Sequence, residues 1–154
     1  MVSPEVLRRY PFFALLDDAH QKAIAMITEE ASYERGAVIF QEGKPAEALY
    51  LLLDGSVDLY FTVEEEYRPE SRKEFLVGEI NPGEPFAISA LIEPYLLTSS
   101  ARAARPCRVL KVEAAALRAL CEVDCRLGYM LMRQAAKAAL ERLHFTRVQL
   151  AAAR

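Results

Sequence analysis

The clearest hydrophobic pattern in the chain lies between Tyr33 and Phe61, where apolar residues recur with the two-residue period of a half-buried strand. Val57 and Leu59 face one side of such a strand, and the residues between them face the other. Asp54-Gly55 precedes this run, and Asp-Gly between two apolar runs favours a hairpin turn. The stretch therefore predicts three strands joined by two turns, over Val38–Phe40, Leu49–Leu53 and Val57–Phe61.

The middle of the chain continues this alternation of apolar runs and turn residues. Glu64–Glu74 is dense in charge and contains Pro69, which predicts a solvated loop. A turn is predicted at Asn81-Pro82-Gly83, followed by a helical turn over Phe86–Ile92. Further strands are predicted over Glu74–Ile80, Leu96–Ala104 and Arg108–Val112.

Both ends of the chain have helical patterns. Val2–Arg9 predicts a weak first helix. Asp17 is suited to cap a second, amphipathic helix over Asp18–Glu30, and we expect His20 in its first turn to be solvated. From Glu113 onward the chain is rich in alanine and leucine, which predicts a helix there and a long helix from about residue 124 to the C-terminus.

The long C-terminal helix carries an uncharged line at heptad spacing. Its members are Tyr129, Met132, Ala136, Ala139, Leu143, Thr146 and Leu150, whereas Arg133, Lys137, Glu141, Arg142 and Arg147 fall off the line. Such a line either packs on the rest of the domain or meets a second copy of itself. Because a helix of this length outreaches a small domain, we expect a homodimer through Tyr129, Met132, Ala136, Ala139 and Leu143.

The residues around the first three strands also resemble a known family. The matching positions are Gly36, Ile39, Phe40, Gly43, Leu49, Tyr50, Leu52, Gly55 and Val57. Together they are similar to the first half of a cyclic nucleotide-binding domain of the Crp/Fnr type, and the likeness continues to Cys107–Leu110. It covers nearly the whole chain. The resemblance implies a mostly β fold with α-helices: a β-roll of the jelly-roll type, with N-terminal helices and a long C-terminal helix.

The resemblance also implies a ligand pocket, and there this sequence departs from the family pattern. In the family, a cassette reads roughly F-G-E-x-A/S-L and, after a gap, R-T/S-A. Its glutamate holds the ribose 2′-hydroxyl, and its arginine pairs with the cyclic phosphate. The corresponding positions here are Phe86, Ala87, Ile88 and Ser89, then Leu97 for the arginine and Thr98 for the hydroxyl, with Ser99 reached by a shifted register. The nearest arginine, Arg102, needs a slip of five residues.

Ile88 and Leu97 replace both charged contacts together, which leaves a consistent apolar pocket instead of one unpaired charge. We therefore expect poor binding of cyclic AMP and cyclic GMP. The preferred interpretation is a non-enzymatic regulatory or sensor module that binds a different, more apolar ligand or none. Two alternatives stay open: a genuine cyclic nucleotide-binding domain, and a dimeric interaction or scaffold protein whose pocket is vestigial and filled by its own side chains.

The length and charge of the chain bear on its domain organisation, its partners and its location. We expect a single domain over residues 1–154, with helices to about residue 31, a β-roll over 32–112 and helices from 113. A net charge of −3 gives no general attraction to nucleic acid or to an anionic membrane, and no apolar run is long enough to span a bilayer. We expect a cytoplasmic protein. The helix-turn-helix that many relatives carry would begin where this sequence ends.

The sequence gives little support for haem binding, metal binding or enzymatic catalysis. Haem would need an axial ligand, but the histidines, cysteines and methionines lie outside the pocket segment, so no cofactor and no metal is expected. Cys121 and Cys125 lie four residues apart; we interpret them as small buried hydrophobes, with a metal or redox pair as the alternative. No nucleophile elbow, phosphate-binding loop or C-x-x-C is present, so an enzyme is not expected.

Overall fold

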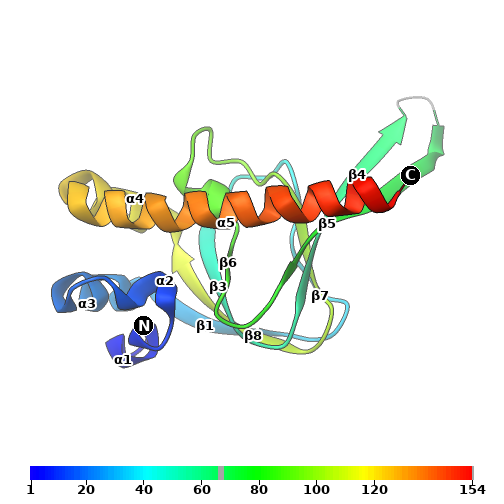
Figure 1. Cartoon of the computed structure of the whole chain (residues 1–154). Helices are drawn as coiled ribbons and strands as arrows, with labels where there is room; N and C mark the ends of the chain where they lie inside the picture. The colour runs from blue at the N-terminus through cyan, green and yellow to red at the C-terminus, as the bar shows by residue number, and fades with distance from the viewer. Residues whose placement is uncertain (66–67, 154) are drawn as a thin grey trace.

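Two antiparallel four-stranded sheets form the body of the protein in the computed structural model (Figure 1). The structure describes residues 1–65 and 68–153. The strand order is β1-β8-β3-β6 in one sheet and β2-β7-β4-β5 in the other. The strands are β1 (Thr28–Tyr33), β2 (Val38–Phe40), β3 (Ala48–Asp54), β4 (Val57–Glu65), β5 (Arg68–Ile80), β6 (Pro85–Phe86), β7 (Ser100–Ala103) and β8 (Cys107–Glu113). The helices are α1 (Pro4–Arg8), α2 (Pro11–Ala14), α3 (Asp18–Met26), the 3-10 helix η1 (Ile88–Leu91), α4 (Ala114–Val123) and α5 (Cys125–Ala152).

The helix expected over Asp18–Glu30 is shorter than predicted. It ends at Met26, and the residues from Thr28 form β1. Thr28 is fully buried and lies opposite Val112 of β8, so the first residues of β1, which were predicted as helix, gain a strand partner that the sequence pattern did not reveal. Tertiary pairing overrides helix propensity here, as it often does for segments near the end of a helix. The helical N-terminal part therefore ends at Met26 and not near residue 31.

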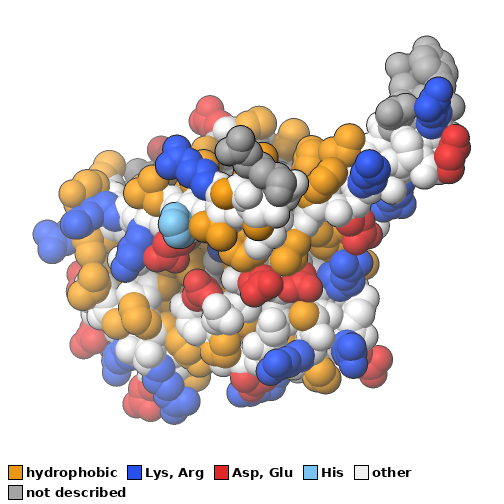
Figure 2. Space-filling view, turned by 45° about the vertical axis from the view of Figure 1, so that its right-hand side comes forward, with side chains coloured by type: hydrophobic (Ala, Val, Ile, Leu, Met, Phe, Trp, Pro, Cys, Tyr) orange, Lys and Arg blue, Asp and Glu red, His pale blue; other side chains and the backbone are white. Residues whose placement is uncertain are grey.

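The charged segment Glu64–Glu74 was predicted as a loop, and for its described residues this was wrong. β4 extends to Glu65 and β5 begins at Arg68, while Glu66 and Tyr67 lie outside the described residues. The two strands form a hairpin that stands out from the body, with charged side chains along it and hydrophobic ones where it joins the body (Figures 1 and 2). β5 lies at the edge of its sheet, where a proline such as Pro69 is tolerated.

The strand predicted over Leu96–Ala104 is confined to Ser100–Ala103. The residues before it make an isolated bridge, between Pro45 and Leu96, and then run along the Gly43-Lys44 turn without continuous pairing. This irregular segment carries three of the residues predicted for the pocket. Its irregular backbone lets consecutive side chains depart from the strict alternation of a strand.

The core lies between the two sheets and beneath the helices. β3 is buried from Ala48 to Leu52 on both of its faces, as expected for a strand that is covered on two sides. Phe86 is fully buried, and its ring stacks on Tyr50 at 5.0 Å between centroids and on Phe40 at 6.0 Å. This stack anchors the start of the segment that follows β6, including η1.

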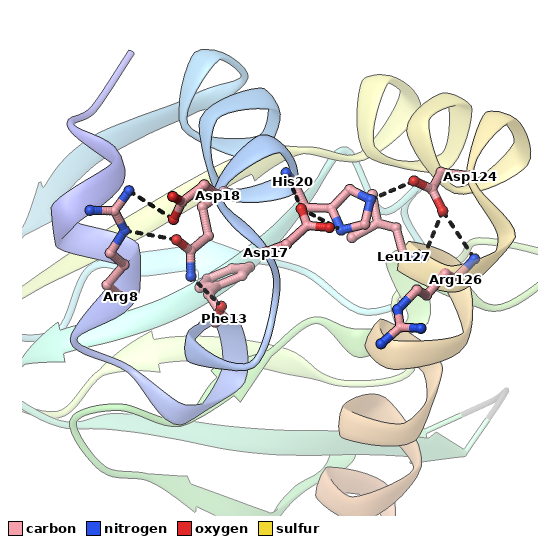
Figure 3. Close-up of polar contacts among 9 residues, drawn as sticks. Arg8, Phe13, Asp17, Asp18, His20, Asp124, Arg126 and Leu127 are labelled. Atoms are coloured by element: carbon pink, nitrogen blue, oxygen red, sulfur yellow. Dashed lines mark hydrogen bonds and ion pairs between the residues drawn. The ribbon is translucent and has the colours of Figure 1, made fainter.

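A polar cluster joins the N-terminal helices to the start of α5 (Figure 3). The side chain of His20 lies between two carboxylates: its Nε2 is 2.5 Å from Asp124, and its Nδ1 is 3.2 Å from Asp17. Asp124 is also the N-cap of α5 and accepts from the backbone N–H groups of Arg126 and Leu127. The hydrogen bond from His20, together with these N–H groups, lowers the pKa of Asp124. The prediction of a solvated His20 was wrong, since its side chain is only 14% exposed.

None of the helices within residues 1–65 and 68–153 combines the length and apolar character that a membrane span requires.

Gly55, in the turn between β3 and β4, supplies the first testable prediction. Its φ is +94°, and a Cβ there would lie 2.4 Å from the Pro106 carbonyl oxygen. Gly55→Ala should therefore lower the free energy of unfolding by more than about 2 kcal/mol, from backbone strain and steric overlap together. Gly36→Ala is the matched control, because Gly36 has a φ of +85° but no atom near the added methyl, and should lose only about 1 kcal/mol. Equal losses in urea denaturation of the two variants would contradict the prediction.

Candidate functional site

A cavity of about 370 Å³ lies between the roll and α5. The roll supplies apolar walls from β2, β4 and β5, and the segment from Ala87 to Ser99 supplies a mixed wall. α5 covers the remaining side. The lining residues are Phe40, Leu59, Phe61, Val77, Ala87, Ile88, Ser89, Leu97, Thr98, Ser99, Ala139, Arg142, Leu143 and Thr146. This lining contains no His, Cys or Met, so it offers none of those ligands to a haem iron.

The structure brings together six of the seven residues predicted for the pocket: Ala87, Ile88, Ser89, Leu97, Thr98 and Ser99 line one cavity. Phe86 lies behind the wall, fully buried in the aromatic stack, and supports the cavity from the core. Arg102 points elsewhere: its guanidinium lies 4.5 Å from the centre of the Tyr60 ring and 3.2 Å from Glu74.

Ala87 occupies a backbone conformation that favours glycine. Its φ and ψ are 59° and 41°, in the left-handed region, and it is the N-cap of η1. The chain must turn sharply here, from β6 into η1, to bring Ile88 and Ser89 to the cavity. An L side chain in this region costs roughly 1–2 kcal/mol, which gives a physical reason for the glycine that the family pattern has at this position.

Backbone hydrogen bonds hold the part of the wall around Leu97 in place. The N–H of Gly43 donates to the carbonyl oxygen of Leu97, and the N–H of Leu97 donates to that of Lys44, both at 2.8 Å. The side chain of Leu97 is thereby held at the wall with 6% exposure. Ser100 follows, and its hydroxyl accepts from the N–H of Glu42 at 3.0 Å.

Arg118 of α4 ties η1 to the C-terminal helices. It donates to the carbonyl oxygen of Ala90 at 2.7 Å, and its guanidinium lies 4.1 Å from the centre of the Tyr95 ring. A hydrogen bond from a charged donor is stronger than one from a neutral donor. The contact between the guanidinium and the ring face adds a cation–π attraction. The wall formed by η1 is therefore coupled to the position of α4, which directly precedes α5.

Arg142 of α5 is a site residue that the sequence pattern did not reveal. It is half-buried at the cavity, and its Nη2 donates to the carbonyl oxygen of Pro85. The side chains that bury α5 against the roll are Leu127, Leu131, Ala135 and Ala138, and a further step of four residues along this face reaches Arg142. Arg142 lies off the uncharged heptad line, so it was not predicted as a site residue. A second helical line through the buried leucines and alanines would have shown it to face inward.

The heptad line predicted for dimer contacts lies on the outer side of α5. Tyr129 is 61% exposed and Met132 is 42% exposed. Ala136, one turn after Met132, is also exposed. Farther along, Ala139 and Leu143 are exposed and also line the rim of the cavity. The line is thus accessible along its length, and its second half borders the candidate ligand site.

The cysteines are free and lie apart from the cavity. Cys107 is buried and Cys121 is half-buried, while Cys125 is exposed at the start of α5. The interpretation of Cys121 and Cys125 as two buried hydrophobes was therefore wrong for Cys125, because position 125 falls after the break between α4 and α5.

Comparison with known proteins agrees with this architecture. Residues 30–124 match the family described as the cyclic nucleotide-binding domain. The chain belongs to this family, a class of regulatory and sensor domains, and the prediction of a β-roll with terminal helices is confirmed. A crystal structure of a protein from Geobacter metallireducens GS-15, named for cyclic nucleotide binding, is 45% identical with a TM-score of 0.81, covering 94% of this chain and 100% of that one.

Other relatives are regulators or channels. The N-terminal domain of a transcriptional regulator from Streptomyces coelicolor A3(2) is 27% identical with a TM-score of 0.66, covering 94% of each chain. The CRP-like cAMP-activated global transcriptional regulator of Mycobacterium tuberculosis is 25% identical over 133 residues, which are 86% of this chain and 57% of the regulator. A protein named as a potassium channel from Rhodopseudomonas palustris is 27% identical over 120 residues, 78% of this chain. The chain spans 57% and 27% of the lengths of these two curated relatives.

Ala87→Gly should stabilise the protein. Glycine removes the left-handed strain at this position but raises the entropy of the unfolded chain, so we expect a net gain of about 0.5–1 kcal/mol in the free energy of unfolding. Ala90→Gly is the matched control within η1, where the helical backbone suits alanine and the side chain is fully buried; it should lower stability. The measurement is urea denaturation, and a loss of stability in Ala87→Gly would contradict the backbone argument.

Proposed function

We propose that this chain is a non-enzymatic sensor module whose cavity binds a small molecule more apolar than a cyclic nucleotide. The observation that carries the proposal is the placing of Ile88 and Leu97 on the cavity wall. These are the positions at which the family pattern expects the glutamate for the ribose and the arginine for the phosphate. An aliphatic pair cannot neutralise a cyclic phosphate, and it leaves a ribose hydroxyl without a partner, at a cost of about 1–3 kcal/mol for that group alone.

The shape of the site favours a ligand over a vestigial pocket. In a pocket filled by its own side chains, Ile88 and Leu97 would interdigitate with α5 and leave little space. The lining instead leaves an open cavity of about 370 Å³, a volume within the range of small-molecule sites. Apolar walls with a few polar groups are typical of such sites.

The proposal includes a homodimer formed through the outer line of α5. Exposed apolar side chains such as Tyr129 and Met132 support it, because large apolar groups gathered on one helix face favour association. Ala136 and Ala139 lie on the same line and would let two helices approach closely. Dimer formation in this way would place a second copy of α5 next to Leu143 at the cavity rim.

Calorimetric titration with cyclic AMP and cyclic GMP tests the ligand class in four proteins: wild type, Ile88→Glu, Leu97→Arg and the double variant. We expect the wild type to bind no tighter than the high micromolar range. The double variant should recover some binding, because it restores both polar contacts on an intact backbone. Either single variant should not, since each places one unpaired charge in the cavity and should also lose stability. Sub-micromolar binding by the wild type would refute the proposed ligand class.

Light scattering at micromolar protein tests the dimer with Ala136→Glu, which changes the outer line of α5 at a position that does not line the cavity. We expect a dimeric wild type and a monomeric Ala136→Glu, because two carboxylates would face each other across the helix pair. Ala151→Glu makes the same chemical change on the last turn of α5, off the line, and should remain dimeric. A monomeric wild type would refute the dimer.

A further inference from the structure

Arg142 is the one feature of the cavity that an apolar ligand alone leaves unexplained. The side chains that bury α5 recur at Leu127, Leu131, Ala135 and Ala138, and the next position on this face holds a guanidinium. Arginine at an inward-facing position desolvates a charge that cannot be given up at neutral pH. Such a position normally holds an apolar residue unless the charge has a partner.

The partners of Arg142 in the described part of the chain do not neutralise it. The contact that its guanidinium makes is with the carbonyl oxygen of Pro85, which is neutral, and no ion pair joins it to a carboxylate in residues 1–65 and 68–153. Burial lowers the pKa of Arg142 to about 10, against the more distant charges of Glu84 and Glu141, which raise it. The group therefore remains protonated at neutral pH.

Other arginines of the same protein are paired differently. Arg8 lies 3.3 Å from Asp18, Arg102 lies 3.2 Å from Glu74, and Arg108 lies 2.6 Å from Glu30. Arg8 and Arg108 are exposed to water, whereas Arg102 is half-buried, as Arg142 is. Arg142 is half-buried and makes no ion pair in the described residues, which is an arrangement expected of a cation that binds an anion from outside the chain.

The cavity in front of Arg142 has two chemical parts. Ser89, Ser99, Thr146 and Arg142 are polar residues of the lining, and the Thr146 hydroxyl donates to the carbonyl oxygen of Arg142. The remaining surface is apolar and is formed largely by β2, β4 and β5, with Phe40 and Val77 among its residues. A guanidinium has five N–H donors, so the bond to Pro85 leaves several for a ligand.

Building on the proposed function, we infer that the cavity binds a small organic monoanion: an acidic head group on Arg142 and an apolar body against the β4–β5 wall. The head group is an oxyanion such as a carboxylate or sulfonate, which matches the donor geometry of a guanidinium. The body lacks the sugar hydroxyls of a nucleotide, since the wall at Ile88 and Leu97 offers them no partner. The anion joins α5 to the roll, because its head group binds the helix and its body binds the sheet.

Two fluorescent probes of nearly the same body separate the two parts of this inference. One is 8-anilinonaphthalene-1-sulfonate, which has an acidic head group, and the other is the uncharged N-phenyl-1-naphthylamine. Arg142→Gln should weaken binding of the sulfonate about 10-fold, as expected for the loss of one charge-assisted contact, and leave the uncharged probe unchanged. Arg133→Gln is the matched control: Arg133 is an exposed arginine of the same helix, near Tyr129, and its loss should affect neither probe.

Two further variants test whether the probes bind in the cavity and whether a loss of binding comes from the lost contact and not from misfolding. Thr98 is exposed at the rim of the cavity, so Thr98→Trp should obstruct entry and weaken both probes. Arg142→Lys keeps the positive charge but lacks the planar arrangement of N–H donors of a guanidinium. It should retain sulfonate binding better than Arg142→Gln does. Thermal melting of each variant establishes that it is folded before its titration is interpreted.

The outcomes separate this inference from the proposed function on which it rests. If Arg142→Gln leaves sulfonate binding intact, or weakens both probes equally, the inference is wrong while the apolar ligand site stands. If Thr98→Trp affects neither probe, or the wild type binds neither, the cavity is not a ligand site and both fail. Selective loss of the sulfonate in Arg142→Gln, with both probes weakened by Thr98→Trp, supports the two together.

Discussion

The packing of α5 across the roll is the constraint on which the rest of the site depends. The sheets and the segment from Ala87 to Ser99 supply walls of the cavity, and α5 adds the wall formed by Ala139, Arg142, Leu143 and Thr146. Leucine and alanine side chains bury the first half of α5, and the hydrogen bond from Arg142 to Pro85 continues this contact beyond them. Because Pro85 directly precedes the buried Phe86, the bond connects the helix to the aromatic stack at the base of the cavity wall.

The cavity combines a backbone frame fixed by main-chain geometry with a mostly apolar set of side chains. Ala87 still turns the chain through a left-handed conformation, and Leu97 is still held by main-chain bonds to the Gly43-Lys44 turn. The side chains that this frame presents are aliphatic, at Ile88 and Leu97. The charged residue of the lining is Arg142, which comes from α5. A frame set by backbone geometry can therefore persist while the chemistry of its ligand changes, because the two depend on different residues.

Much of the fold could be predicted from the sequence, because local signals and family pattern agreed. Asp54-Gly55 and the alternation after it identified the β3–β4 hairpin, and six residues of the cassette frame line one cavity in the structure. Two kinds of information were missing. The strand at Thr28 and the extension of β4 and β5 depend on partners distant in sequence, which periodicity within one segment does not reveal. Arg142 is not revealed by the heptad line, because α5 has a second line of buried residues, and the arginine lies on that second line.

Asp124 has a mechanical consequence, because it caps α5 and also accepts from His20 of α3. The helix is thus hinged at its first turn to the N-terminal layer. With a rise of about 1.5 Å per residue, Arg142 lies roughly 27 Å from this pivot and the end of the helix at Ala152 roughly 42 Å from it. A rigid rod pivoted at Asp124 turns a displacement of 1 Å at Arg142 into about 1.5 Å at its tip. The last turns of α5 are therefore where a small change at the cavity has its largest geometric effect.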